Sequence, residues 1–253
     1  MHADHREIAL AFAKSIAAAD TGFAAEQAIK GADALSETAL HPILARGLTA
    51  CGFGVHREVY YPVFAEPAQG AGDPARDRCD LVLTESPDAE LLDPIHSGRR
   101  VRAAQGTLFA GAAQTMEANA TADAVPPAQA LWIEVKAVAQ YAYRDGVPGP
   151  NGAYTSEIVN GPASDVCKLM GDGIIEQAAA VLVLFTESQE VAQHDIEQVA
   201  HRLLDMGLPI GLPETSCTQI EDRAGNTHAT VAVFPIRGLG LALAEVDTEN
   251  QES

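Results

Sequence analysis

The sequence predicts an α/β protein in which helices flank one central mixed β-sheet. Helical and strand-like segments alternate along the chain, and 47% of its 253 residues are hydrophobic, enough for a large buried core. The run AAVLVLFTE at 179–187 is continuously apolar, as in strands that are buried on both faces. We expect residues 1–253 to form a single domain, since this length suits one large core.

The N-terminal part of the chain is predicted to be helical. Ile8, Phe12 and Ile16 follow one another at the four-residue spacing of one helix face, which indicates a helix over residues 1–19. Residues 20–36 are rich in Ala and Gly and predict a short second helical piece.

Residues 1–35 are therefore interpreted as a helical extension before the core. The core itself is predicted to begin with a helix over 36–51, in which Leu44 and Leu48 belong to an apolar stripe. Proline fits easily only in the first turn of a helix, so Pro42 indicates that this helix either begins late or is kinked.

Three strands are predicted next, because three segments are rich in β-branched and aromatic residues. They are VHREVYYPVF (55–64), RCDLVLTE (78–85) and ALWIEVKAVAQY (130–141). Residues 86–129, between the second and third strands, show no clear period and are expected to be an insertion.

The remainder of the chain predicts a loop, two helices, a buried strand and a closing hairpin. In order, these are a loop over 144–163, a helix from about Ser164, the strand at 179–187, a helix over 194–207, a hairpin around the turn DRAGN and a flexible acidic tail at 245–253.

The sequence lacks the marks of several protein classes. The N-terminus has neither the basic start nor the uninterrupted apolar stretch of a secretory signal, and no apolar run reaches the roughly 18–20 residues of a membrane span. The four cysteines are scattered and include no CxxC pair, so no zinc site or disulfide framework is indicated. We therefore expect a cytoplasmic protein without a membrane partner. No phosphate-binding GxxxxGK[ST] motif is present either.

The third predicted strand carries the first candidate for catalysis. In WIEVKAV the alternation of a strand places Trp132, Glu134 and Lys136 on the face opposite Ile133 and Val135. A carboxylate and an ammonium group two residues apart then point to the same place. Spacing alone favours a simpler reading, in which the two side chains form a surface ion pair of little energy.

A second acid, Asp80, lies in the preceding predicted strand. If the two strands are neighbours, Asp80 and Glu134 can share one hard cation, for which Mg²⁺ is well suited. Such a metal polarises a phosphoryl group and acidifies a bound water, and Lys136 would orient that water and offset charge in the transition state. On the residues alone, a phosphodiester-cleaving centre of this kind is the alternative to the surface ion pair that the spacing favours.

The stretches HPILARGLTACGFGVHREVYYP, RCDLVL, LWIEVKAV and SDVCKLM before AAVLVLF resemble the PD-(D/E)XK, or restriction-endonuclease-like, nuclease superfamily. The resemblance covers about 36–187 and implies an αβββαβ core with a central mixed sheet. It implies that Asp80, Glu134 and Lys136 are catalytic residues of an endonuclease that uses Mg²⁺, with Mn²⁺ as a substitute, to cut nucleic acid, in the first place DNA. Cys79 departs from the family's proline, and the segment between the two acids is longer than the family minimum.

The resemblance also implies further site residues. Many family members place an acid on the helix before the first strand, and Glu37 is the candidate third metal ligand, with Glu58 as the competing candidate; a structural salt bridge is the alternative for both. Lys168 is a candidate for a contact with phosphate, whereas an ion pair with Asp165 one turn away is the simpler interpretation.

Three more residues are candidates for substrate binding. Gln140 ends the third strand, where its side chain would either touch the substrate or pack. Arg99 and Arg100 form a basic knot with Arg102 in the expected insertion, and either reach a phosphate backbone or remain a solvated charge cluster.

The net charge weighs against a nucleic-acid partner. Acids outnumber bases 35 to 16, which gives −19, whereas proteins that bind nucleic acid usually show a basic face. The alternative function is therefore a catalytically silent binding or regulatory protein of the same fold, with a protein partner. A weaker alternative is a hydrolase of smaller phosphoesters. A homodimer would suit cleavage of both strands of a duplex.

Overall fold

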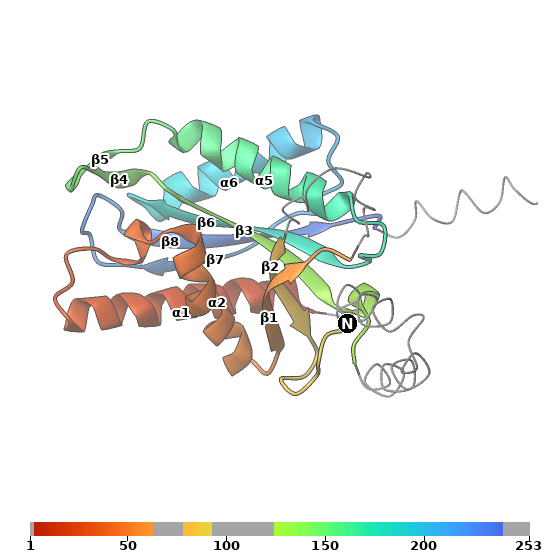
Figure 1. Ribbon diagram of the computed structural model, residues 1–253. Coiled ribbons are helices and arrows are strands. Elements are labelled where there is room, and N and C mark those ends of the chain that lie inside the picture. Colours follow the sequence, from red (N-terminus) through yellow and green to blue (C-terminus); the bar gives the residue numbers. More distant parts are fainter. Residues whose placement is uncertain (1–2, 63–77, 93–123, 240–253) are drawn as a thin grey trace, which may run out of the picture.

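The computed structural model describes residues 3–62, 78–92 and 124–239. Six strands form one mixed sheet in the order β1-β2-β3-β6-β8-β7, and β4 and β5 form a separate hairpin. Helices α1 and α2 cover one face of the sheet, and α5 and α6 cover the other (Figure 1). The elements are α1 (His5–Ala25), η1 (Ala32–Ala34), α2 (Glu37–Ala50), β1 (Gly54–Tyr60), β2 (Arg78–Thr84), η2 (Pro127–Gln129), β3 (Leu131–Ala139), β4 (Tyr141–Arg144), β5 (Val147–Pro150), α5 (Tyr154–Met170), β6 (Ala178–Thr186), α6 (Gln189–Asp205), β7 (Glu214–Gln219) and β8 (His228–Ile236). The predicted α/β class with a flanked mixed sheet is confirmed.

The strand pairing explains where the sheet is open. β1, β2 and β3 are antiparallel neighbours, and β3 runs parallel to β6 along its whole length. The β2–β3 ladder is short, because it runs only from Leu83 opposite Leu131 to Leu81 opposite Ile133. Beyond Ile133, no strand among the described residues pairs with the edge of β3 that faces β2.

Two apolar cores lie on the two faces of the sheet. One core joins α1 and α2 to the sheet and contains Ile8, Phe12 and Ile16, the predicted face of the first helix. The other joins α5 and α6 to the sheet. Strand β6 is buried at every position, which confirms the prediction for the continuous apolar run.

Helix α1 is longer than expected and belongs to the core. Among the described helices, it alone is long and apolar enough to cross a membrane by length and composition. The expectation that no segment reaches that length was therefore too strict. In the structure α1 packs against β7, β8 and α2, and its apolar face is buried there. A buried core helix of a globular protein can have the same length and apolar composition as a membrane span.

Helix α2 begins one residue after Ser36, whose side chain accepts a hydrogen bond from the Ala39 N–H group and caps the helix. Pro42 lies inside the helix rather than at its start. Leu44 and Leu48 are fully buried and hold this helix against the sheet. Because α2 starts early, Glu37 lies in its first turn.

The prediction of a loop over 144–163 is wrong, because α5 already begins at Tyr154 and contains Pro162 in its interior. Ile158, on the same helix, is buried in the core beneath, so tertiary packing outweighs the helix-breaking tendency of proline. Gly161 has a specific role: a Cβ atom there would lie 2.7 Å from the Cδ atom of Lys136. Glycine therefore lets α5 lie directly over β3.

The same predicted loop also contains β5. Asp145 and Gly146 both have positive φ angles, 53° and 81°, and connect Arg144 to its partner Val147. A two-residue turn of this kind favours the pair Asp-Gly. The hairpin signal was present in the sequence and was missed.

The expected insertion is described only at its ends. Its two ends meet, since the Leu92 N–H donates to the Val125 carbonyl and the Val125 N–H donates to the Glu90 carbonyl. Residues 93–123 and the acidic tail at 245–253 lie outside the described residues. The closing hairpin of β7 and β8 is confirmed.

Candidate metal centre

The candidate centre lies where β2 and β3 separate. Asp80 directly precedes Leu81, the residue of β2 at which the pairing with β3 ends. Its carboxylate oxygen Oδ2 accepts a hydrogen bond of 2.8 Å from the Val135 N–H. The side chain thus takes the position that a backbone carbonyl of β2 would otherwise hold. As a result, the Asp80 carboxylate is fixed against the open edge of β3.

Glu37 occupies the next position along the same edge. Its Oε2 atom accepts a hydrogen bond of 3.0 Å from the Ala137 N–H. N–H groups two residues apart on a strand point to the same edge, so Asp80 and Glu37 satisfy successive free donors of β3. The structure therefore places the predicted acid of α2 and the predicted acid of β2 at successive positions along the edge of β3.

Glu134 is the most buried acid of the centre, with 3% of its side chain exposed. The Tyr61 hydroxyl donates a 2.5 Å hydrogen bond to its Oε1 atom, and the Lys168 ammonium group lies 4.0 Å from Oε2. Burial, and next the charge of the nearby Asp80 carboxylate, raise the pKa of Glu134 to about 8. The two acids are therefore close enough to oppose each other's ionisation.

Lys136 begins on the α5 face of the sheet, as alternation predicted, and turns around the open edge of β3. Its aliphatic chain lies against Gly161, and its Nζ atom is 3.1 Å from Oε2 of Glu37. Both charged groups are about one-third exposed. The pairing of Lys136 is thus with Glu37, which comes from a different element, and not with Glu134 two residues away.

Lys168 forms the predicted ion pair with Asp165, at 3.1 Å, and also points to Glu134. Burial alone would lower the pKa of Lys168, but the carboxylates of Glu134, Asp165 and Asp80 outweigh it and raise the pKa. The ion pair with Asp165 is present, and the Lys168 ammonium group also faces Glu134, whereas its contact with phosphate stays a prediction.

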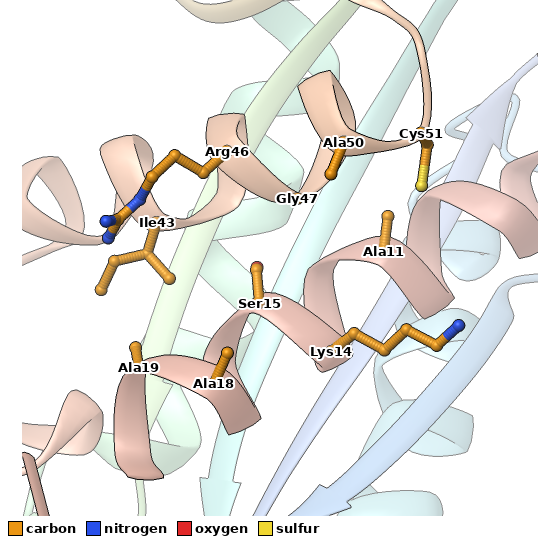
Figure 2. Close-up of a pocket in the computed structure, with 10 residues that line it drawn as sticks. All are labelled: Ala11, Lys14, Ser15, Ala18, Ala19, Ile43, Arg46, Gly47, Ala50 and Cys51. Atoms are coloured by element: carbon orange, nitrogen blue, oxygen red, sulfur yellow. The ribbon is translucent and has the colours of Figure 1, made fainter. Parts of the chain in front are cut away.

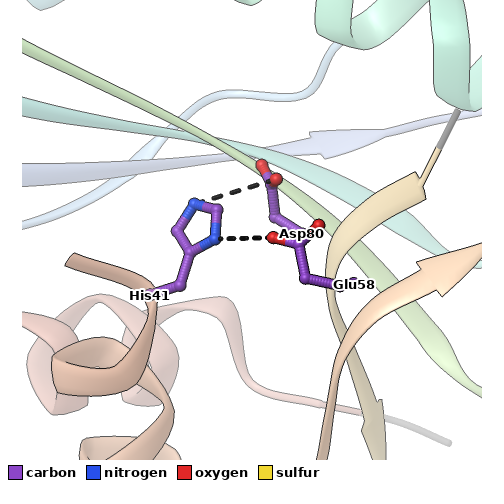
Figure 3. Close-up of side chains that lie close together, drawn as sticks. All are labelled: His41, Glu58 and Asp80. Carbon is purple, nitrogen blue, oxygen red and sulfur yellow. Dashed lines mark ion pairs between the residues drawn. The ribbon is translucent and has the colours of Figure 1, made fainter. Parts of the chain in front are cut away.

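On the other side of Asp80 lie His41 and Glu58 (Figure 3). His41 is one helical turn after Glu37, and Glu58 lies opposite Asp80 in the β1–β2 register, between the pairs Arg57–Leu81 and Val59–Cys79. The His41 Nε2 atom is 3.7 Å from Oδ1 of Asp80, and its Nδ1 atom is 3.4 Å from Oε1 of Glu58. One ligand atom from each residue lies within 4.8 Å of the others.

The charges of the centre are unbalanced. Five carboxylates gather around two lysines and one histidine; the carboxylates are those of Glu37, Glu58, Asp80, Glu134 and Asp165. Of these carboxylates, that of Asp80 adds to the effect of burial in raising the pKa of Glu134. Oxygen-rich sites of this kind bind hard divalent cations, and the residues present fit Mg²⁺.

Sequence reasoning missed His41 and Tyr61. His41 was signalled by its position four residues after Glu37, since side chains at that spacing share a helix face. Tyr61 follows the end of β1 and stacks on Trp132, with ring centroids 5.9 Å apart. No spacing in the sequence links Tyr61 to Glu134, so its contact depends on the fold.

The remaining predicted substrate contacts are Gln140, Arg99 and Arg100. The side-chain oxygen of Gln140 accepts a hydrogen bond from the Glu187 N–H, which ties the end of β3 to the end of β6. Arg99 and Arg100 lie outside the described residues. Substrate roles for these three residues stay predictions.

A separate groove of about 420 Å³ lies between α1 and α2 (Figure 2). Lys14 and Arg46 are at its rim, and the lining contains no carboxylate. The helices approach closely here, since a Cβ atom on Gly47 would lie 2.7 Å from the Ala11 carbonyl oxygen. None of the acids described above lines this groove, so the candidate centre lies at a different place.

Comparisons of the chain with protein-family models, with curated proteins and with solved structures found no match.

Proposed function

We propose that this chain is a Mg²⁺-dependent nuclease that hydrolyses phosphodiester bonds, in the first place those of DNA. The single observation that carries the proposal is the meeting of Asp80 and Glu134 at the point where β2 leaves β3, with the pKa of Glu134 raised to about 8. Two crowded carboxylates in a buried place are the arrangement that a divalent cation would relieve.

The arrangement of the chain supports a restriction-endonuclease-like core. Helix α2, strands β1, β2 and β3, helix α5 and strand β6 follow one another in the αβββαβ order. The first three strands are antiparallel neighbours, and the fourth joins β3 in parallel. Asp80, Glu134 and Lys136 stand at the positions in this order that the resemblance implies.

In the proposed site Asp80 and Glu134 hold the cation, with Glu37 beside them. A bound Mg²⁺ supplies polarisation of the phosphoryl group and acidification of a water. Tyr61 holds Oε1 of Glu134 by its hydrogen bond, which fixes the orientation of that carboxylate. Lys136 is held at the open edge by Glu37, where its ammonium group orients the attacking water and offsets developing negative charge.

The second candidate is a binding protein that has this fold but no catalysis. Two observations favour it: the net charge of −19, and the engagement of both Lys136 and Lys168 by carboxylates. In that case the acidic surface would meet a basic protein partner.

Cleavage assays separate the two candidates. Plasmid and oligonucleotide substrates are incubated with the full chain in Mg²⁺, Mn²⁺ or EDTA. We expect cleavage that disappears in EDTA and in the Asp80→Ala and Lys136→Ala variants, and persists in Lys14→Ala, a change on the exposed side of α1. Equal activity in all variants would indicate a contaminating nuclease, and no cleavage under any condition would favour the binding protein.

A further inference from the structure

We infer that His41, Glu58 and Asp80 form a second cation position, which takes a divalent transition-metal ion such as Mn²⁺ in preference to Mg²⁺. This inference rests on the proposed function only in that Asp80 serves both positions. The three residues come from α2, β1 and β2, so the fold gathers them from three separate elements.

The state of the His41 imidazole is the first observation. Only 1% of this side chain is exposed, and neither ring nitrogen has a hydrogen-bond partner among the residues that the structure describes. A buried polar group without a partner is costly. The nitrogens lie 3.4 Å and 3.7 Å from the flanking carboxylate oxygens, too far for good hydrogen bonds. A cation bound between the ring and the acids would satisfy one of the two ring nitrogens.

The backbone of Glu58 is the second observation. Its φ angle is +54°, in the left-handed region that non-glycine residues rarely adopt. Such strain is typically kept where a side chain has to be aimed at a functional place. Here the unusual backbone occurs at the strand position opposite Asp80, and the Glu58 carboxylate approaches His41.

Ligand chemistry decides which cation this position would take. Mg²⁺ prefers oxygen ligands and keeps most of its waters, whereas first-row transition metals also accept an imidazole nitrogen, and among them Mn²⁺ is the ion best suited to carboxylates. Two metal–ligand bonds of about 2.1 Å join atoms up to about 4.2 Å apart. The three ligand atoms lie within 4.8 Å, so a small inward movement would close them around an ion.

Because the second cation position lies beside the proposed Mg²⁺ site, its cation would take part in the proposed phosphodiester cleavage. Asp80 would bridge the two cations, because its Oδ1 atom faces His41 while the rest of the carboxylate lies at the edge of β3. Paired cations about 3.5–4 Å apart stabilise both the attacking and the leaving oxygen in phosphoryl transfer. We therefore expect Mn²⁺ to occupy the second position when it is supplied.

The test detects the nitrogen ligand directly and needs no nuclease activity. Electron spin echo spectroscopy is recorded on the full chain with one equivalent of Mn²⁺ and no nucleic acid. We expect nitrogen modulation from a coordinated imidazole in the parent chain and in Glu134→Gln, and its loss in His41→Asn. The matched control is His56→Asn, since the Nε2 atom of His56 is also buried and has no hydrogen-bond partner in the described part of the chain. This control should keep the modulation.

Several results would overturn the inference. These are a parent chain that binds no Mn²⁺, a bound Mn²⁺ without nitrogen modulation, and modulation that survives His41→Asn or is lost in His56→Asn. If His41→Asn fails to fold, Glu58→Gln serves instead, and we expect Mn²⁺ affinity to fall by at least about tenfold; an unchanged affinity would then refute the site. Failure of the proposed function is distinguishable, because it leaves the modulation present while nucleic acid stays intact.

Discussion

The carboxylate of Asp80 accepts the Val135 N–H at the point where β2 stops pairing with β3, so a side chain continues the hydrogen-bond pattern of the ladder. Glu37 does the same for the Ala137 N–H. The open edge of β3 therefore presents two fixed carboxylates beside Glu134. This geometry yields the predictions that follow.

Removal of Glu134 should alter the pH dependence of stability. Its pKa is raised from 4.5 to about 8 by burial and by Asp80, so between these values the folded state binds more protons than the unfolded state. The free energy of unfolding of the metal-free protein should then fall as pH rises from about 4.5 to 8 and level off above. Chemical denaturation across this range should show a flatter profile for Glu134→Gln. An identical profile would contradict the raised pKa.

Binding of Mg²⁺ should release a proton from Glu134. The cation needs the ionised carboxylate, so its affinity should rise by about tenfold per pH unit below the pKa and become constant above about pH 8.5. Calorimetric titrations in buffers of different ionisation enthalpy measure both the affinity and the released protons. Affinity that is independent of pH would exclude Glu134 as a ligand.

Lys136→Met should separate binding from turnover. The ammonium group is held by Glu37 and does not contact Glu134, so we expect Mg²⁺ affinity within a few-fold of the parent value. Cleavage should fall by at least about 10²-fold, because a positioned charge in the transition state is lost. Lys14→Met is the control for loss of a lysine. Equal losses of metal affinity and turnover would refute the role given to Lys136.

Glu58→Gly should increase stability. Glycine adopts positive φ without a steric penalty, and the left-handed conformation costs other residues roughly 1–2 kcal/mol. We expect a gain of about 1 kcal/mol in the free energy of unfolding, and none in Glu58→Gln, which keeps the strained backbone. A loss of stability in the glycine variant would show that the Glu58 side chain contributes more to folding than its backbone strain costs.

Phe12 tests the assignment of α1 to the core. Its side chain is fully buried between α1 and the sheet, so Phe12→Ala should destabilise the fold by about 3–5 kcal/mol. Leu10→Ala changes the same helix at a position that is 44% exposed and should cost under about 1 kcal/mol. Similar small effects of both changes in thermal unfolding would speak against this packing.

Much of the fold was predictable because its signals are local. The uniform apolar character of β6 and the four-residue spacing of Ile8, Phe12 and Ile16 each predict burial directly. The beginning of α5 was not predictable in this way. There Pro162 is a local signal against a helix, and only the packing of Ile158 and of Gly161 over Lys136 reverses it.

In the candidate site, too, some features were predictable from local sequence signals and others depend on tertiary structure. Alternation within β3 places Glu134 and Lys136 on one face, and the resemblance implied an acid of the site on the helix before the first strand. The partners of these groups depend on tertiary structure: Lys136 reaches Glu37, and Glu134 receives the Tyr61 hydroxyl. His41 could have been inferred from its helical spacing to Glu37, but its approach to Asp80 depends on the close packing of α2 against β2.

The shared cation at Asp80 and Glu134 is the central claim, and Mg²⁺ titration calorimetry at pH 8 tests it most directly. The parent chain and Glu197→Gln, a change on the exposed side of α6, should bind Mg²⁺ alike. Asp80→Asn and Glu134→Gln should each abolish the same binding event. Parent-like Mg²⁺ binding by Glu134→Gln would contradict the claim.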